Sequence, residues 1–160
     1  MSMHIAIESP DQPEVTALIA RLDAYQVSLY PPESNHLIDL AALRRPEVLF
    51  AVARDAAGRA CGCGALRLMS GYGEVKRVYV ATEQRGLGVG AALLGFLEGQ
   101  AGAGGCRVFR LETGVHQREA LALYRRAGNV RRGPFAHYPE DPLSVFMEKR
   151  VGDAAEQGAP

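Results

Sequence analysis

The sequence has no apolar run near the roughly 20 residues that a membrane-spanning helix needs. It has only three cysteines, at positions 61, 63 and 106, and its first residues show no signal-peptide pattern. An odd and small number of cysteines is typical of the reducing cytosol, where structural disulfides are rare. We therefore expect a cytoplasmic protein without a membrane partner.

Patterns that bind metals or nucleic acids are also missing. Cys61 and Cys63 lie two apart in a strand-like run, which would point both the same way, but no second Cys/His pair accompanies them. We expect small buried side chains and no metal site. Eighteen basic and eighteen acidic residues cancel, and no basic cluster is large enough for nucleic acid. The densest basic segment, residues 125–132, fits a solvated helix end or a contact with an anionic cofactor.

Glycine, in contrast, is concentrated in the segment RGLGVGAA at residues 85–92. This segment follows an apolar-rich run, 75–80, that has the character of a strand, and it precedes Leu93, Phe96 and Leu97 at helical spacing. The first amides of a helix have no partner within the helix and lie at the positive end of its dipole. Glycine adds close backbone approach, so the segment predicts a site for a phosphorylated cofactor.

Hydrophobic spacing along the 160 residues predicts one domain over residues 1–150 and a flexible tail over 151–160. The predicted strands are 4–7, 48–53, 60–69, 74–80, 107–112, 130–132 and 143–149. One helix is expected to begin at a capping box, Asp11 to Glu14, and a second is expected to be capped by Ser34. A third follows the glycine segment to about Gly99, and a fourth runs from about Gln117 to Ala127.

Two motifs carry a family resemblance. Arg85, Gly88 and Gly90 form Arg-x-x-Gly-x-Gly after the fourth strand, and Ala120-x-x-Leu-Tyr124 lies on the last helix. With the order of elements, the pair resembles the GNAT superfamily of acetyl-CoA-dependent N-acetyltransferases over about residues 3 to 150. The resemblance implies an α/β (α+β) fold, with a mixed, mostly antiparallel sheet of about seven strands flanked by about four helices.

The same resemblance implies how acetyl-CoA would bind. Backbone amides of the glycine segment would hold the pyrophosphate: Arg85, Gly86, Leu87, Gly88, Val89, Gly90 and Ala91. Backbone groups of Val78, Tyr79 and Val80 would pair with the pantetheine arm, and an amide near Val78 would polarise the acetyl carbonyl. Gln117, where the family often has Asn, and Tyr124 complete the expected cofactor contacts. Asn129 replaces a frequent Phe, which affects packing beneath the last strands.

Acetyl transfer to an amine needs a base that removes the ammonium proton and an acid for the departing thiolate. Glu74, at the start of the cofactor-binding strand, is the first candidate base, and Glu112, at the end of the next strand, is the second. Tyr124 is the candidate acid, because a free phenol with a pKa near 10 suits protonation of a thiolate. No cysteine has a sequence signature of activation, so direct transfer in a ternary complex is expected.

The expected acceptor is a primary amine on a small molecule or amino acid. Loops of the first half and the last hairpin would surround it, with Tyr30, Glu33, His36 and Tyr138 as candidate contacts. A homodimer through the C-terminal strands is possible.

Two alternatives remain open at the level of sequence. Gly86-x-Gly88-x-x-Ala91, with Glu112 further on, partly matches a dinucleotide-binding pattern. Five residues separate the strand from its first glycine, however, and the preceding hairpins are expected to be antiparallel. A P-loop is excluded because no Gly-Lys-Ser/Thr follows. A catalytically degenerate acyl-CoA sensor would share the fold and the cofactor site.

Overall fold

The computed structural model describes residues 3–34 and 39–152. The strands are β1 (His4–Ile7), β2 (Val48–Arg54), β3 (Ala60–Met69), β4 (Tyr72–Val80), β5 (Val108–Gly114), β6 (Val130–Arg132) and β7 (Ser144–Arg150). The α-helices are α1 (Pro13–Leu29), α2 (Leu40–Leu43), α3 (Val89–Ala103) and α4 (Arg118–Arg126), and the short 3-10 helices are η1 (Pro32–Ser34) and η2 (Thr82–Gln84).

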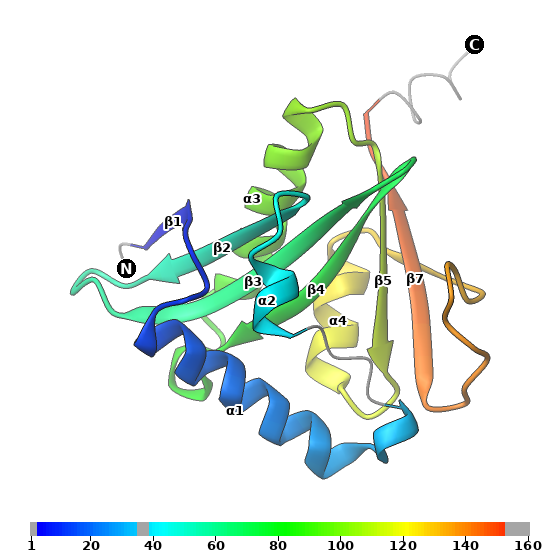
Figure 1. Cartoon of the computed structure of the whole chain (residues 1–160), viewed down its shortest axis with the longest axis horizontal. Coiled ribbons are helices and arrows are strands. Elements are labelled where there is room, and N and C mark those ends of the chain that lie inside the picture. Colours follow the sequence, from blue (N-terminus) through cyan, green and yellow to red (C-terminus); the bar gives the residue numbers. More distant parts are fainter. Residues whose placement is uncertain (1–2, 35–38, 153–160) are drawn as a thin grey trace.

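The described strands form one sheet in the order β1-β2-β3-β4-β5-β7-β6 (Figure 1). The pair β4–β5 is parallel and every other neighbouring pair is antiparallel. This confirms the predicted mixed, mostly antiparallel sheet with seven strands and four helices. A dinucleotide-binding sheet is mostly parallel and doubly wound, so the dinucleotide alternative does not fit this topology.

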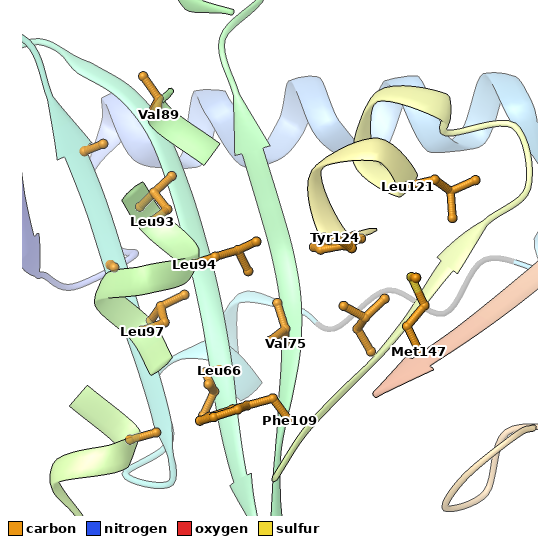
Figure 2. Packing of buried hydrophobic residues seen from close by; sticks show 14 of the residues in the cluster. Leu66, Val75, Val89, Leu93, Leu94, Leu97, Phe109, Leu121, Tyr124 and Met147 are labelled. Atoms are coloured by element: carbon orange, nitrogen blue, oxygen red, sulfur yellow. The ribbon is translucent and has the colours of Figure 1, made fainter. Parts of the chain in front are cut away.

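Helices cover both faces of the sheet. On one face, α3 and α4 bury leucines and Tyr124 against β3, β4, β5 and β7 (Figure 2). On the other face, α1 and α2 pack Val15, Leu18 and Leu43 against β2 and β3. A separate aromatic cluster of Phe135, Tyr138 and Phe146, with Tyr72 beside it, covers the β5–β7 half. Each helix therefore turns its apolar stripe to the sheet, as its spacing predicts.

The parallel pair β4–β5 is joined only at its beginning. Pairing covers Gly73–Val75 of β4 and Phe109–Leu111 of β5, after which the strands diverge (Figure 1). A bulge in β4 increases the separation. Opposite the stretch of β3 from Cys63 to Ala65, β4 has one extra residue, at Arg77. Bulges bend a strand and interrupt its ladder. The sheet is consequently open between the ends of β4 and β5.

Some local predictions were wrong. Asp11 does not cap α1, which begins at Pro13 with Gln12 as N-cap; Asp11 accepts a bond from Arg44 Nη1 at 3.1 Å instead. Asp39, and not Ser34, caps the second helix, through a bond of 2.8 Å from the amide of Ala42. Gln117 is the N-cap of α4 rather than a helical residue.

The cysteines also differ from the prediction. Cys61 and Cys63 are both buried, but they belong to cores on opposite faces of the sheet. The cause is a register shift between β2 and β3, where Ala53 pairs with Gly62 and Arg54 with Ala60, so that Cys61 is an extra residue. Burial raises the pKa of the Cys63 thiol to about 12, which keeps it protonated and inert.

Beyond β7, the amide of Val151 still donates to the carbonyl of Arg107 at 2.9 Å. The ordered fold thus includes the first residue of the segment predicted to be a flexible tail, and 153–160 lie outside the described residues.

Candidate functional site

A cavity of about 310 Å³ lies where β4 and β5 separate. Its walls come from α1, the end of β4, the glycine segment and α4. The lining residues are Leu22, Tyr25, Val78, Tyr79, Val80, Gln84, Arg85, Gly86, Gly88, Val89, Gly90, Ala91, Gln117, Glu119, Ala120, Leu123, Tyr124 and Arg126. Every predicted cofactor-binding residue is among them except Leu87, which is half exposed (50%).

The glycine segment presents free backbone amides to this cavity. Gly86 and Gly88 have φ of 82° and 81°, a left-handed conformation that glycine adopts readily. Gly88 is the N-cap of α3, and no described side chain caps the helix there. The first intrahelical bond runs from the amide of Ala92 to the carbonyl of Gly88, so the three preceding amides are available to an anion.

Gly90 has a different role, because a Cβ there would lie 3.0 Å from Leu123 of α4. Its lack of a side chain lets the two helices that frame the cavity approach each other.

Arg85 fixes the loop to the strand. Its Nε donates to the carbonyl of Val80 at 3.2 Å, and its Nη1 contacts Glu119 of α4 at 3.2 Å. The guanidinium also lies 5.6 Å from the ring centre of Tyr79, within the range of a cation–π contact. Arg85 therefore joins β4, the glycine segment and α4 around the cavity mouth. Of the basic segment 125–132, Arg126 lines this cavity, whereas Arg132 is paired with Glu148 at 2.6 Å.

Tyr124 reaches the cavity from α4. The side chain is buried (7% exposed), and its hydroxyl has no hydrogen-bond partner among the described residues. Burial, with a smaller effect of the nearby Glu112 carboxylate, raises the pKa of this phenol well above its usual range. Gln117 supports the turn that leads to α4, because its Oε1 accepts from the amide of Gly114 at 3.1 Å. An unpartnered phenol at the split in the sheet is able to donate a proton to a bound group.

Glu74, the first candidate base, is buried (4% exposed) and has two close partners. Tyr138 Oη donates to its Oε2 at 2.5 Å, and Lys76 Nζ lies 3.3 Å from the same oxygen. Lys76 Nζ also donates to Tyr138 Oη at 2.6 Å. Burial and the Glu74 carboxylate raise the pKa of Tyr138 far above its usual range, so the phenol stays protonated and donates to Glu74.

Glu112, the second candidate base, has fewer partners. Its Oε2 accepts from Ser144 Oγ of β7 at 2.9 Å. Burial raises the pKa of its carboxyl to about 7, although the bond from Ser144 and the charge of Lys76 act in the opposite direction. Its negative charge acts in turn on Tyr124 and on Tyr138. Glu112 thus interacts electrostatically with the phenol of Tyr124 and with the Glu74–Lys76–Tyr138 cluster.

Two of the four predicted acceptor residues, Tyr30 and Tyr138, are buried. Tyr30 is buried at the end of α1, where its Oη accepts from the amide of His116 at 3.1 Å and its ring stacks on the His116 ring. Tyr138 is in the buried cluster with Glu74. Glu33 is exposed on η1, and His36 lies outside the described residues. Their contact with an acceptor stays a prediction.

The loops expected to surround the acceptor, one from the first half of the chain and one before β7, are in contact. Ser34 Oγ donates to Asp141 Oδ2 at 2.6 Å, which joins η1 to the loop before β7. The acceptor surroundings expected from sequence are therefore close together in space.

Sequence reasoning missed the contribution of α1 to the cavity and the bond between Lys76 and Tyr138. Leu22 and Tyr25 line the cavity, but their helical spacing indicated only core positions. Lys76 lies two residues from Glu74 on β4, so strand alternation could have placed both side chains on one face. Its bond to Tyr138 joins residues 62 apart and has no local signal.

Among the described residues, no three His, Cys, Asp or Glu side chains gather as metal ligands do. No helix within residues 3–34 and 39–152 has the length and hydrophobicity to span a membrane.

Comparisons with known proteins agree with this geometry. The model of the acetyltransferase (GNAT) family matches residues 15–128. The IAA acetyltransferase of Azospirillum brasilense is 50% identical over 147 residues, covering 91% of this chain and 95% of the relative. The uncharacterized N-acetyltransferase YsnE of Bacillus subtilis is 35% identical over 152 residues, 93% of this chain and 100% of its own.

Solved structures show the same fold. A candidate acyl-CoA N-acyltransferase from Klebsiella pneumoniae has a TM-score of 0.83 at 44% identity, covering 94% of this chain and 98% of that one. The PaiA N-acetyltransferase of Thermoplasma acidophilum, in complex with coenzyme A, has a TM-score of 0.72 at 18% identity, with coverage of 94% and 100%. From the sheet, the cavity and these relatives, the chain belongs to the GNAT family of acetyltransferases.

Proposed function

We propose that the protein moves the acetyl group of acetyl-CoA directly to a primary amine of a small molecule. The observation that carries the proposal is the cavity itself, which joins the uncapped N-terminus of α3 to Tyr124 and to the split between β4 and β5. The glycine segment of this cavity suits a phosphate group, and Tyr124, the candidate acid, lines the same cavity.

The residues present fit acetyl-CoA. The amides of Val89, Gly90 and Ala91, at the positive end of the α3 dipole, would hold the pyrophosphate. Val78 and Val80 of β4 line the cavity beyond its ladder with β5, where the arm of the cofactor would run. Coenzyme A bound to the Thermoplasma protein of the same fold supports this assignment.

When bound, acetyl-CoA supplies an activated acyl group as a thioester. The backbone amide at Val78 would donate to the acetyl carbonyl, where negative charge develops as the amine attacks. The Tyr124 hydroxyl would then donate its proton to the departing thiolate sulfur. Its raised pKa keeps it protonated until that stage.

The contacts favour Glu112 over Glu74 as the base that takes the proton of the acceptor ammonium. A base is most effective when its pKa is near the working pH, and the pKa of Glu112 is about 7. One oxygen of Glu74 already accepts a hydrogen bond from Tyr138 and contacts the cation of Lys76. We assign Glu74 to holding Lys76 and Tyr138 in place beside the acceptor.

The small-molecule acceptor is supported by the Azospirillum relative, whose name gives its acceptor as IAA.

Thermal denaturation with acetyl-CoA or CoA is expected to raise the unfolding midpoint, whereas NAD(H) and NADP(H) leave it unchanged. A ligand at 100 times its Kd adds about 2.7 kcal/mol to the free energy of unfolding, because it binds only the native state. For a domain of this size that corresponds to a shift of about 5–10 °C. Thiol release in a screen of small amines then distinguishes an enzyme from a sensor. A shift with dinucleotides alone contradicts the proposal, and binding without turnover of any amine supports the sensor.

Gly88→Ala is expected to raise the Kd for CoA by about 5- to 30-fold, since a left-handed alanine disfavours the loop by about 1–2 kcal/mol. Nothing lies within 4 Å of the added Cβ, so the effect is conformational. Gly58→Ala is the matched control, because Gly58 has φ of 83° and equally open space in the β2–β3 turn. Calorimetric titration with CoA measures both variants. Equal Kd values for the two would contradict a role for the loop in binding.

A further inference from the structure

Arg77 has an unusual backbone for a residue within a strand. Its φ is 58°, in the left-handed region that residues with a Cβ seldom adopt. It lies at the bulge of β4, where Cys63 of β3 pairs with Tyr79 and Ala65 pairs with Lys76. Gly64 is therefore opposite two residues of β4, Arg77 and Val78. Such a conformation persists only where the surroundings hold it in place.

The side chain of Arg77 provides one such restraint. It is 5% exposed, and its guanidinium forms an ion pair with Asp23 of α1, whose side chain is 38% exposed. Burial lowers the pKa of Arg77 to about 10. Because a buried charge without a partner is strongly unfavourable, the pair ties the bulge to α1.

Close packing from β3 also restrains the bulge. A Cβ at Gly64 would lie 3.3 Å from Val78 Cγ2 and 3.2 Å from Leu97 Cδ1, so glycine at this position makes room for the displaced strand. The carbonyl of Arg77 also accepts a weak bond from Cys63 Sγ at 3.8 Å. The path of the chain into Val78 is thus restrained from β3 as well as from α1.

The bulge leads directly into the cavity. Val78, the next residue, lines it, and so do Leu22 and Tyr25, which are neighbours of Asp23 on α1. A bulge leaves a strand residue without its ladder partner and turns its peptide group. The ion pair consequently connects one wall of the cavity to the peptide that follows Arg77.

We propose that the Arg77–Asp23 ion pair positions the bulge of β4 so that the amide of Val78 faces the acetyl carbonyl during transfer. The proposal rests on the proposed function, in which acetyl-CoA occupies this cavity. Arg77 and Asp23 are positioning residues: they act through the backbone and do not touch the reacting atoms. The glycine segment, which holds the other end of the cofactor, is independent of them.

Two variants test this. Asp23→Asn removes the negative partner, and Arg77→Gly removes the cation while a glycine still adopts a φ of 58° without strain. Both are expected to lower kcat at least about tenfold, because catalysis depends on fine orientation of the reacting groups. The Kd for CoA should change less than about twofold, since the α3 amides bind the phosphates. In the Arg77→Gly background, Asp23→Asn should cause no further loss of kcat.

A spectroscopic measurement separates positioning from general stability. In isotope-edited infrared spectra of acetyl-CoA labelled with ¹³C at the carbonyl, the wild-type complex should show the carbonyl band at lower frequency than free acetyl-CoA. In both variants the band should return toward its position in free acetyl-CoA. Asp11→Asn, which breaks the exposed Arg44–Asp11 pair, should leave both the band and kcat unchanged.

An unchanged band and kcat in Asp23→Asn would overturn the proposal, and so would a lower unfolding midpoint with a wild-type band. If Arg77→Gly does not fold, Asp23→Asn carries the test by itself, because its side chain is partly exposed. Failure of the proposed function is distinguishable, because the wild-type protein would then either bind no acetyl-CoA or bind it without releasing thiol to any amine. This positioning role would fall with it.

Discussion

Replacing Tyr124 by phenylalanine is expected to lower kcat by about 10²- to 10³-fold, in the range typical of losing a general acid. The phenol reaches the cavity from α4, and its hydroxyl has no partner among the described residues, so removing it breaks no hydrogen bond that holds the fold. The ring itself is part of the buried cluster on the α3–α4 face, and phenylalanine preserves it (Figure 2).

The Kd for CoA should therefore remain near the wild-type value, and the loss should appear in kcat rather than in binding. Pre-steady-state thiol release, compared with calorimetric titration of CoA, separates these quantities. Tyr72→Phe is the control, because Tyr72 packs on the aromatic cluster outside the cavity. If Tyr124→Phe retains wild-type kcat, the phenol is a packing residue and the departing thiolate receives its proton from another group.

Local signals in the sequence predicted the loop and the helix start that line the cavity. The helix expected after the glycine segment does begin there, at Val89, and Gly86 and Gly88 have a left-handed backbone. Strand and helix positions along β2 to β7 also followed from hydrophobic spacing, since each element packs one apolar face on the sheet. These features depend on neighbours in sequence, which is why spacing was sufficient.

The features that the sequence did not predict depend on partners that lie far away along the chain. The predicted capping box at Asp11 is not formed: α1 begins at Pro13 with Gln12 as N-cap, and Asp11 pairs with Arg44. Alternation placed Cys61 and Cys63 on one face, but a bulge set by pairing between β2 and β3 separated them. The Glu74–Tyr138 bond joins residues 64 apart, and nothing local to either residue indicates it. Catalytic surroundings are built from such contacts, so sequence identified candidate groups without showing which carboxylate is free to act.

Glu112→Gln is expected to lower kcat/KM by about 10²-fold at pH 8 and to abolish its pH dependence near neutrality. In the wild-type protein the Glu112 carboxyl has a pKa of about 7, because burial disfavours its charged form. A base acts only when ionised, so wild-type kcat/KM should rise as the pH increases through about 7 and then level off. Glu74→Gln should keep this rise, and Glu140→Gln, an exposed loop variant, should match the wild type at every pH.

The same substitution has a stability signature that needs no substrate. The folded-state pKa of Glu112, about 7, is above the ordinary glutamate pKa of 4.5 that applies in the unfolded chain. Its contribution to stability is therefore complete below pH 4.5 and is lost as the pH rises through about 7. Each unit of difference is worth about 1.4 kcal/mol, giving a loss on the order of 3 kcal/mol that a neutral glutamine does not undergo. Urea unfolding should therefore show Glu112→Gln gaining stability over the wild type between pH 4 and pH 8.

If Glu74→Gln loses the rise in kcat/KM with pH and Glu112→Gln retains it, Glu74 is the base. That conclusion holds even if the stability difference between Glu112→Gln and the wild type appears as expected.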